Sequence, residues 1–320
     1  MVSGTVGSLG EFGLIAALTA RLPQHAGVLL GPGDDAAVLV APDGRVVVSA
    51  DVLVQDRHFR LLAGQGAAVG RKAAAANLAD VAAMGAMPTA LLLGLVAPAD
   101  LDAQWLLDMA AGLAEEAAET GAAVVGGDVT AGPLVVLAVS ALGNLQGRTP
   151  VRRAGARVGD VVAVCGRLGD SAAGFALLEA GLGDRHPDLV AAHRCPRPPY
   201  AAGPRAADAG ATSMIDVSDG LLADLGHVAA ASGVRIDLAA AALSPDERLC
   251  AAAADLGLDP ADWVFTGGED HPLVATFPPD ASLPPGWRGI GWVHAGEPAV
   301  TVDGATRPGR AGWDHFGESR

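Results

Sequence analysis

Apolar and polar positions in the first half of the chain predict a regular succession of helices and strands. Apolar residues at helical spacing, and long Ala-rich stretches ended by Gly or Pro, predict helices. Short apolar runs bounded by Gly, Pro and Asp predict strands. The predicted helices cover 11–22, 69–84 and 101–120, and the predicted strands cover 28–30, 36–40, 46–49, 91–96, 122–125 and 134–142.

The same pattern restarts after a stretch rich in Arg and Gly over 146–159. Four prolines over 186–203 predict a linker or loop there. Strands that alternate with helices are typical of α/β or α+β layers. We therefore predict two α/β domains, 1–148 and 149–320, of which the second is the C-terminal α/β domain. Its predicted strands cover 161–164, 213–217 and 273–277, and its predicted helices cover 171–180, 221–232 and 251–256.

Composition excludes several classes of protein. The net charge is −15 and Lys72 is the only lysine among 320 residues, so nucleic acid is not expected as a partner. No apolar run reaches the length of a membrane span, and residues 1–12 lack the pattern of a signal peptide. Three widely spaced cysteines predict buried free thiols rather than a disulfide framework or a zinc site. We therefore expect a cytoplasmic protein that does not bind membranes.

Apolar runs in this chain repeatedly lead into aspartate. One aspartate at the end of a strand usually forms a turn or caps a helix. Asp80 adds to the pattern, because it lies in the middle of an otherwise apolar predicted helix, where an unpaired carboxylate is costly. Four such strand ends and one buried acid indicate a functional cluster. The four ends carry Asp34 with Asp35, Asp51, Asp128, and Asp216 with Asp219.

Carboxylates that lie together need cations between them, and Mg²⁺ prefers hard oxygen ligands, including phosphate oxygens. Gly31, Gly33, Gly126 and Gly127 would let the backbone approach phosphate closely. The chain has no Gly-x4-Gly-Lys-Ser/Thr loop, so it is not a P-loop protein. The segment 31–36 matches a dinucleotide fingerprint only weakly, since a strand rather than a helix is expected to follow it. A kinase of another architecture remains.

Seven motifs together carry a resemblance that covers nearly the whole chain. In chain order they are Gly31-Pro-Gly-Asp-Asp35, Asp51 with His58-Phe59, Asn77-Leu-Ala-Asp-Val-Ala-Ala-Met-Gly-Ala86, Gly126-Gly-Asp128, Ile215-Asp-Val-Ser-Asp-Gly-Leu-Leu-Ala-Asp-Leu-Gly226, Gly267-Gly-Glu-Asp270 and Gly312-Trp-Asp-His-Phe316. Each motif alone is weak to moderate. As an ordered set they resemble the thiamine-monophosphate kinase family.

The resemblance implies a two-domain α/β fold of the aminoimidazole-ribonucleotide-synthetase-like superfamily. In that superfamily the N-terminal domains of two subunits pair, and their sheets form a shared barrel. The implied protein is a homodimer whose N-terminal domain binds ATP and metal. The implied activity is a phosphotransferase with a phosphate group as acceptor. It transfers a phosphoryl group from ATP directly and in line to thiamine monophosphate, giving thiamine diphosphate with several Mg²⁺ ions.

The resemblance also implies site residues, carried over motif by motif. The implied catalytic residues are Asp51, Asp128 and Asp219. The implied metal ligands are Asp35, Ser49, Asp51, Asp80, Asp128, Asp216 and Asp219. The implied ATP contacts are Gly127, Asp128, Arg153 and Ser218, and the implied substrate contacts are His58, Glu269 and Trp313.

Some positions depart from the family pattern or have a simpler explanation. Ala50 stands where the family often has Thr, and His271-Pro272 stand where it often has Tyr-Glu. Arg153 lies in a basic stretch that favours a solvated role equally, and Trp313 has core packing as its alternative. His58 has edge packing beside Phe59 as its alternative.

Two other functions remain as alternatives. One is a carbamoyl dehydratase-like maturation protein of the same superfamily, although that protein uses a cysteine near its C-terminus and the last cysteine here is Cys250. The other is a non-catalytic cation-binding protein, for which no EF-hand spacing is found.

Overall fold

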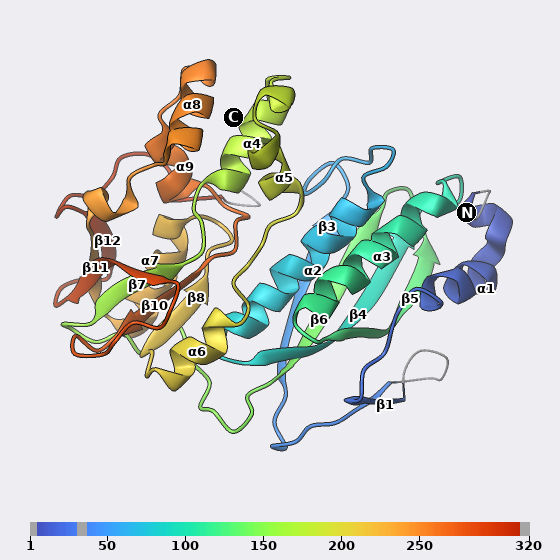
Figure 1. Cartoon of the computed structure of the whole chain (residues 1–320), viewed down its shortest axis with the longest axis horizontal. Coiled ribbons are helices and arrows are strands. Elements are labelled where there is room, and N and C mark those ends of the chain that lie inside the picture. Colours follow the sequence, from blue (N-terminus) through green and yellow to red (C-terminus); the bar gives the residue numbers. More distant parts are fainter. Residues whose placement is uncertain (1–4, 31–36, 314–320) are drawn as a thin grey trace. The chain divides into compact units, whose positions relative to one another are not determined.

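A computed structural model describes residues 5–30 and 37–313. The chain divides into two compact units, one made of 1–81 with 86–147 and the other of 82–85 with 148–320. Each unit has its own sheet flanked by helices (Figure 1), so the predicted mixed α/β composition is confirmed. The division of roles expected for 1–148 and 149–320 stays a prediction.

The first unit is built on a four-stranded sheet with the strand order β3-β6-β4-β5. Strands β4 and β5 run parallel, and the other neighbouring pairs are antiparallel. A separate two-stranded ladder joins β1 and β2. The elements are α1 (Val6–Thr19), β1 (Val28–Leu30), β2 (Val38–Leu39), β3 (Val47–Val54), α2 (Gly66–Ala83), β4 (Met87–Ala97), α3 (Ala103–Glu119), β5 (Ala123–Ala131) and β6 (Val136–Asn144).

Glycine lets helices α2 and α3 pack with their backbones in contact. A Cβ atom on Gly70 would lie 1.9 Å from the carbonyl oxygen of Met109, and one on Gly112 would lie 2.0 Å from that of Ala67. Only glycine fits such distances. The two helices lie side by side along the sheet (Figure 1), and Asn77 and Asp80 of α2 contact β3.

The two faces of this sheet differ in burial. Alternate residues of a strand point to opposite faces. Leu93 and Val139 are paired in register and are buried. Val48, Val52 and Leu92 belong to the other face and are 66%, 51% and 37% exposed. One face of the sheet is therefore packed in the core, and much of the other is open and apolar.

The second unit is built on a six-stranded sheet with the strand order β12-β9-β11-β7-β10-β8. Only the pair β12 and β9 is parallel. The elements are β7 (Val161–Cys165), α4 (Asp170–Glu179), η1 (Gly183–Arg185), α5 (Pro187–Arg194), α6 (Ala202–Asp208), β8 (Ser213–Asp216), α7 (Leu221–Ser232), β9 (Arg235–Leu238), η2 (Ala240–Leu243), α8 (Glu247–Leu256), α9 (Pro260–Thr266), β10 (Leu273–Phe277), β11 (Trp287–His294) and β12 (Ala299–Val302).

Strand β7 shows why the apolar runs in this half are continuous. Val162 and Val164 pack in one core cluster together with residues of α4, α7, α8 and α9. Ala163 and Cys165 pack in a second cluster, together with residues of α6. Both faces of the strand are covered, so every second position need not be polar.

Several elements differ from the sequence-based prediction. The predicted loop over 186–203 contains helix α5, because Pro187 stands at the first helical position, where a missing N–H costs nothing. Strands β9, β11 and β12 and helices α6 and α9 were not predicted. In β11, Gly289 and Gly291 interrupt the alternation of apolar and polar residues by which a strand is predicted. A Cβ on Gly291 would lie 2.2 Å from the carbonyl oxygen of Asp237 in the paired strand β9.

The three cysteines are free thiols, as expected, but only Cys165 is fully buried. Cys195 is half-buried, and Cys250 is exposed on α8, which corrects the expectation of buried thiols. Among the described residues, no helix combines the length and apolar character that crossing a membrane requires.

Candidate functional site

In the first unit, β3 and α2 bring together three of the expected metal ligands. The hydroxyl of Ser49 donates to Oδ2 of Asp80 at 2.5 Å. Asn77, one turn before Asp80, accepts the backbone N–H of Asp51 through Oδ1 at 3.1 Å. Asn77 is fully buried, and its amide group donates to the carbonyl oxygen of Ala73. These contacts place Ser49, Asp51 and Asp80 on the helix-covered face of the sheet, at the edge strand.

The sequence pattern indicated that Asp80 needs a partner, and the structure gives it one. Asp80 lies within α2, half-buried, and its carboxylate accepts the Ser49 hydroxyl. Asp51 also differs from the prediction, because it lies inside β3 rather than at the end of a strand. The strand is longer than its apolar run because its polar residues face α2.

Asp128 does not join Asp51 within this unit. Asp51 shares one row of the sheet with Val139, Leu93 and Gly127, whereas Asp128 pairs with Gly94 in the next row. Neighbouring positions on a strand point to opposite faces, so Asp128 lies on the open face. Three strand spacings of about 4.8 Å also separate β3 from β5, roughly 14 Å in all. The sequence could not reveal this, because it gives neither strand order nor register.

His58 lies in the turn that follows β3. Its Nδ1 accepts the backbone N–H of Val54 at 3.0 Å, so a neutral imidazole carries its hydrogen on Nε2. The neighbouring Phe59 is buried and stacks on Trp105 with ring centroids 6.2 Å apart. Edge packing is therefore the role of Phe59, while His58 is half-buried and bonded to the backbone of β3.

Part of the expected site lies outside the described residues. The segment 31–36, which includes the expected ligand Asp35 together with Asp34, Gly31 and Gly33, is not among them. The same holds for 314–320, the end of the last motif.

In the second unit, the expected residues converge on the segment between β8 and α7. Strand β8 ends at Asp216, as the sequence pattern predicted. The backbone N–H of Glu269 donates to the carbonyl oxygen of Ser218 at 2.8 Å, and that of Trp313 donates to the carbonyl oxygen of Asp219 at 2.8 Å. The expected metal, ATP and substrate residues Asp216, Ser218, Asp219, Glu269 and Trp313 thus meet in one place.

Glycine makes this meeting possible. A Cβ atom on Gly268 would lie 2.3 Å from the carbonyl oxygen of Ser218, and one on Gly312 would lie 2.3 Å from that of Asp219. Glu269 and His271 adopt left-handed backbone angles with φ of 64° and 53°. This conformation is uncommon for residues other than glycine and marks a constrained loop.

Trp313 is not a core residue. Its side chain is 57% exposed, although its backbone is fixed to Asp219. The core-packing alternative is therefore wrong, because more than half of the residue's surface is exposed.

Arg153 does not lie with Ser218. Its carbonyl oxygen accepts the hydroxyl of Ser232, the last residue of α7, at 3.1 Å. Ser218 lies before the start of this helix, whose 12 residues span about 18 Å at 1.5 Å per residue. The backbones of the two residues therefore lie near opposite ends of α7. Arg153 is exposed, which agrees with the solvated alternative.

Asp224 belongs to the site and was missed as a functional residue. Its Oδ2 accepts the backbone N–H groups of Asp219 and Gly220 at 3.0 and 3.1 Å. Burial, together with the negative charge of Asp216, raises the pKa of Asp224 to about 7. The available signal was its position in the motif 215–226, five residues after Asp219, where a helix was predicted to have begun.

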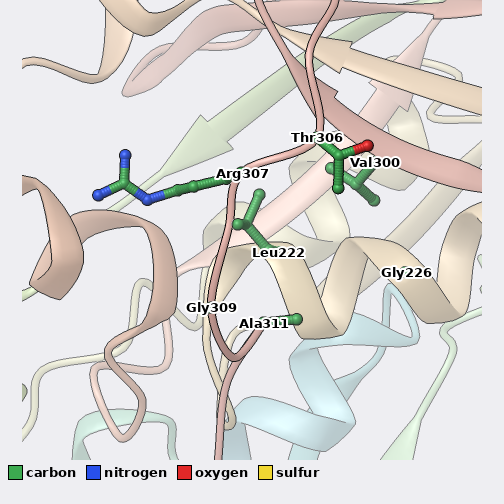
Figure 2. A pocket seen from close by; sticks show the side chains of 7 residues that line it. All are labelled: Leu222, Gly226, Val300, Thr306, Arg307, Gly309 and Ala311. Carbon is green, nitrogen blue, oxygen red and sulfur yellow. The ribbon is translucent and has the colours of Figure 1, made fainter.

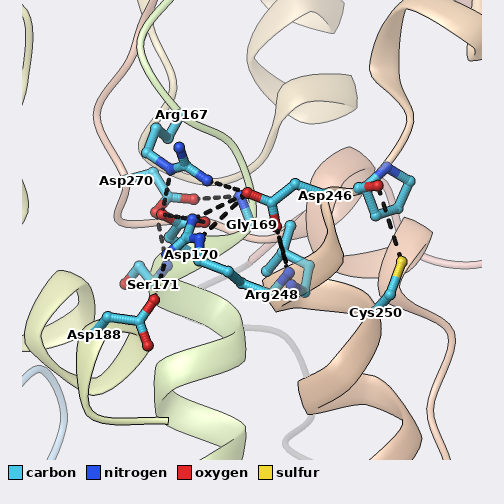
Figure 3. Close-up of polar contacts among 11 residues, drawn as sticks. Arg167, Gly169, Asp170, Ser171, Asp188, Asp246, Arg248, Cys250 and Asp270 are labelled. Carbon is cyan, nitrogen blue, oxygen red and sulfur yellow. Dashed lines mark hydrogen bonds and ion pairs between the residues drawn. The ribbon is translucent and has the colours of Figure 1, made fainter.

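The Glu269 loop is anchored by its next residue, Asp270, to the start of α4 (Figure 3). The Asp270 carboxylate accepts the backbone N–H of Gly169 at 2.6 Å and that of Ser171 at 2.7 Å. A helix N-terminus favours such an anion. Burial nevertheless raises the pKa of Asp270 to about 7.

A network of charges holds the same end of α4 against α8 (Figure 3). Buried Asp170 accepts from Arg167 at 2.5 Å and from Arg248 at 2.9 Å. Arg167 also pairs with Asp246, and Arg248 pairs with Asp188 at 2.6 Å. Charges that are buried in this way are stable only with such partners. The network fixes the platform to which the Glu269 loop is bound.

His193 approaches Glu269 from α5. Its Nδ1 lies 3.1 Å from the hydroxyl of Ser171 and 3.8 Å from Oε2 of Glu269. The imidazole also packs against Phe175, with ring centroids 5.4 Å apart. No local sequence signal marks His193, because only the packing of α5 on α4 brings it to this loop.

A small pocket lies between α7, β12 and the segment 306–311 (Figure 2). Its volume is about 210 Å³. Leu222 and Ala311 point towards it, whereas Arg307 extends away from it (Figure 2). The Arg307 guanidinium pairs with Asp262 at 2.5 Å and lies 4.9 Å from the centre of the Phe265 ring. The pocket is mostly apolar and contains none of the expected site residues. Its lining is Leu222, Gly226, Val300, Thr306, Arg307, Gly309 and Ala311.

The donors present fit Mg²⁺ in kind. Carboxylate and hydroxyl oxygens of Ser49, Asp51 and Asp80 in the first unit, and of Asp216 and Asp219 in the second, are hard ligands. The raised pKa of Asp224 also indicates a surplus of negative charge beside Asp216. Across residues 5–30 and 37–313, however, no three His, Cys, Asp or Glu side chains converge as a complete metal site.

Comparisons with known proteins agree with these motifs. Residues 33–145 match AIR synthase related protein, N-terminal domain, and residues 157–269 match its C-terminal domain. A thiamine-monophosphate kinase of Mycobacterium tuberculosis is 53% identical, over 99% of this chain and 94% of that protein. The chain belongs to the thiamine-monophosphate kinase family. A family member from Corynebacterium glutamicum is 44% identical, over 98% of this chain and 95% of that protein.

Solved structures of the family have the same fold. A thiamine-monophosphate kinase from Stenotrophomonas maltophilia has a TM-score of 0.77 at 34% identity, over 91% of this chain and 95% of that one. AaThiL complexed with AMPPCP and TMP has a TM-score of 0.78 at 30% identity, over 99% of this chain and 100% of that one. Hydrogenase maturation protein HypE, at 20% identity and a TM-score of 0.68, shares the fold alone.

The position of Asp224 gives a test of stability against pH. The folded pKa is raised above the unfolded value of about 3.9, so its stabilising contribution is complete below pH 4 and is lost as the pH rises to about 7. Asp224→Asn keeps an oxygen for both N–H groups and removes the charge. In chelator-containing buffer we expect this variant to melt about 2–6 °C above the parent at pH 8. The difference should be smaller at pH 5.5. Equal differences at both pH values, measured by calorimetry, would contradict the shift.

Proposed function

We propose that this protein transfers the γ-phosphoryl group of ATP to thiamine monophosphate and forms thiamine diphosphate. The observation that carries the proposal is 53% identity to a thiamine-monophosphate kinase over 99% of the chain. The meeting of Asp216, Ser218, Asp219, Glu269 and Trp313 in the second unit supports it.

We further propose that Mg²⁺ is bound by Ser49, Asp51 and Asp80 in the first unit and by Asp216 and Asp219 in the second. Bound Mg²⁺ would neutralise the charge of the phosphate groups. Asp35 and Asp128 stay proposed ligands from the resemblance. Ser218 and Gly127 are proposed to contact ATP. Arg153 keeps that proposed role from the resemblance only, since it lies apart from Ser218.

The organic part of the substrate is proposed to lie between Trp313 and Glu269. A thiazolium ring is a flat cation, and an exposed indole and a carboxylate suit it. The Glu269 side chain is 38% exposed, so both groups are accessible to a ligand. His58 is proposed as a further contact to the substrate on the basis of the resemblance.

We propose direct transfer without a phospho-enzyme, because both donor and acceptor are bound phosphates. Of the alternatives, the maturation protein is less well supported, because HypE is 20% identical to this chain whereas a thiamine-monophosphate kinase is 53% identical. A cation-binding protein without activity predicts metal binding without product. A cytoplasmic location is proposed on the basis of ATP as co-substrate.

The direct test is to incubate the purified protein with ATP, thiamine monophosphate and Mg²⁺ and identify the products. We expect thiamine diphosphate from the parent and from Asp100→Asn, an exposed control in the same unit. Asp51→Asn should lower kcat by about 100-fold or more, because charge stabilisation by metal contributes several kcal/mol. The backbone contact with Asn77 survives this change. Product formation from other acceptors but not from thiamine monophosphate would disprove the proposal.

Trp313 gives a test of the substrate site. Trp313→Ala should raise KM for thiamine monophosphate about fivefold or more, because stacking on a cation contributes on the order of 1 kcal/mol. KM for ATP and the melting temperature should change little, since the indole is exposed. Trp292→Ala, which removes another exposed indole on β11, is the matched control. Equal loss of affinity for both substrates would place the thiamine site elsewhere.

We also propose a homodimer in which the open faces of two first-unit sheets meet. Val48, Val52 and Leu92 are exposed there, next to the small residues Gly94 and Ala138. The β1–β2 ladder covers only one end of this face, through Val28 and Leu39 against the cluster of Ala90, Ala123 and Val125. An apolar face of this kind needs cover, and a second copy offers an identical one.

The dimer can be tested by light scattering. The parent should have twice the chain mass of 31.8 kDa. Val52→Asp should weaken association at least about 100-fold, because an unpaired charge would be buried in each half of the interface. Val158→Asp alters a comparably exposed valine of the second unit and should leave the mass unchanged. A monomeric parent at working concentration would refute the assignment.

A further inference from the structure

His271 and Asp216 form a buried pair that the proposed mechanism does not use. Nδ1 of His271 lies 3.1 Å from Oδ2 of Asp216, and the two residues are 6% and 4% exposed. An ionised carboxylate only accepts hydrogen bonds, so the imidazole donates from Nδ1. His271 is also one of the positions at which the chain departs from the usual family pattern.

We propose that His271 is a positioning residue for the metal site: its Nδ1–H holds Oδ2 of Asp216 and leaves Oδ1 as the oxygen presented to the divalent cation. This inference rests on the proposed role of Asp216 as a ligand. Groups behind a metal ligand commonly fix its orientation in this way. Within 5–30 and 37–313, Asp216 has no other ion pair or side-chain hydrogen bond.

The backbone around His271 is arranged to hold this pair. His271 has a φ of 53°, in the left-handed region. Its N–H donates to the carbonyl oxygen of Val217 at 3.1 Å, and the N–H of Val217 donates to that of Pro272 at 2.9 Å. These two bonds tie the residue directly to the chain that carries Asp216. The left-handed angle aims the imidazole at the carboxylate, and the two backbone bonds offset its strain.

The surrounding charges explain why orientation matters. Asp216 and Asp219 are two residues apart, and buried Asp224 lies close enough to Asp216 for its pKa to be affected. If the Asp216 carboxylate rotated freely, its oxygens would point towards Asp224 part of the time instead of towards a cation. A donor on Oδ2 fixes the direction of the second oxygen.

Two substitutions separate positioning from mere packing. His271→Asn places an amide N–H near the position of Nδ1, and Asn tolerates the left-handed backbone. His271→Gly tolerates the backbone equally but has no donor. His227→Asn, at an exposed position on α7, is the control for a histidine outside the site.

The measurement is a Mn²⁺ titration of each full-length protein, followed by electron paramagnetic resonance, with an ATP analogue that cannot transfer its γ-phosphoryl group. We expect the parent, His271→Asn and His227→Asn to bind within about threefold of one another. His271→Gly should bind about 10–100-fold more weakly, the usual effect of losing a group behind a metal ligand. Parent-like affinity in His271→Gly, or equal loss in both His271 variants, would overturn the proposal, as would a parent that binds no Mn²⁺.

A measurement on the parent alone keeps the proposal falsifiable if His271→Gly does not fold. The ¹⁵N spectrum of the histidine side chains should show hydrogen on Nδ1 of His271, and an unprotonated Nδ1 would overturn the proposal. Failure of the proposed function is distinguishable, because it appears as absence of thiamine diphosphate from the parent. The titration and the spectrum do not depend on that product.

Discussion

The second-unit site depends on the close backbone contact between two loops. Val217 and Ser218 are bonded to His271 and Glu269, and Pro272 is bonded to Val217. Gly268 is required at the contact, since a Cβ there would lie 2.3 Å from a carbonyl oxygen. Without this contact, the end of β8 with its carboxylates and the loop with Glu269, a proposed substrate contact, would lie apart.

The contact between the loops is supported by charge as well as by backbone bonds. Asp270 is bound to the start of α4, and Asp170 fixes that start to α8 through Arg248. The carboxylate of Asp224 holds the turn before α7 in the same manner. Buried carboxylates that accept backbone N–H groups thus shape the loops, while the neighbouring carboxylates of Asp216 and Asp219 are the proposed metal ligands. The same residue type serves both roles, and burial with hydrogen bonding distinguishes them.

The sequence predicted most long elements, because their apolar patterns extend over many residues. Helix α7 and strands β7, β8 and β10 lie close to their predicted ranges. Short helices such as α5 and α6, and the Gly-containing strand β11, have weak patterns and were missed. In the site, the motifs marked Asp216, Glu269 and Trp313, and the structure brings their segments together through backbone bonds to 217–219. Asp224 and His193 were missed as functional residues, because their roles follow from burial and from packing between helices.

The separation of Asp51 and Asp128 has a consequence for how metals can be bound. The two residues lie on opposite faces of one sheet, roughly 14 Å apart across three strand spacings. A Mg²⁺ ion binds its oxygen ligands at about 2.1 Å, so a single ion cannot contact both carboxylates of one chain. If both are ligands, they bind different ions, or they reach one ion only through a second subunit that lies on the open face.

Asp128 lies on the open face of the sheet, where Val48, Val52 and Leu92 are exposed. Pairing of two such faces would bury the negative charge of Asp128, which is costly unless a bound cation compensates it. The proposed metal binding at Asp128 and the proposed pairing of the sheets would therefore be physically coupled, since each would make the other less costly.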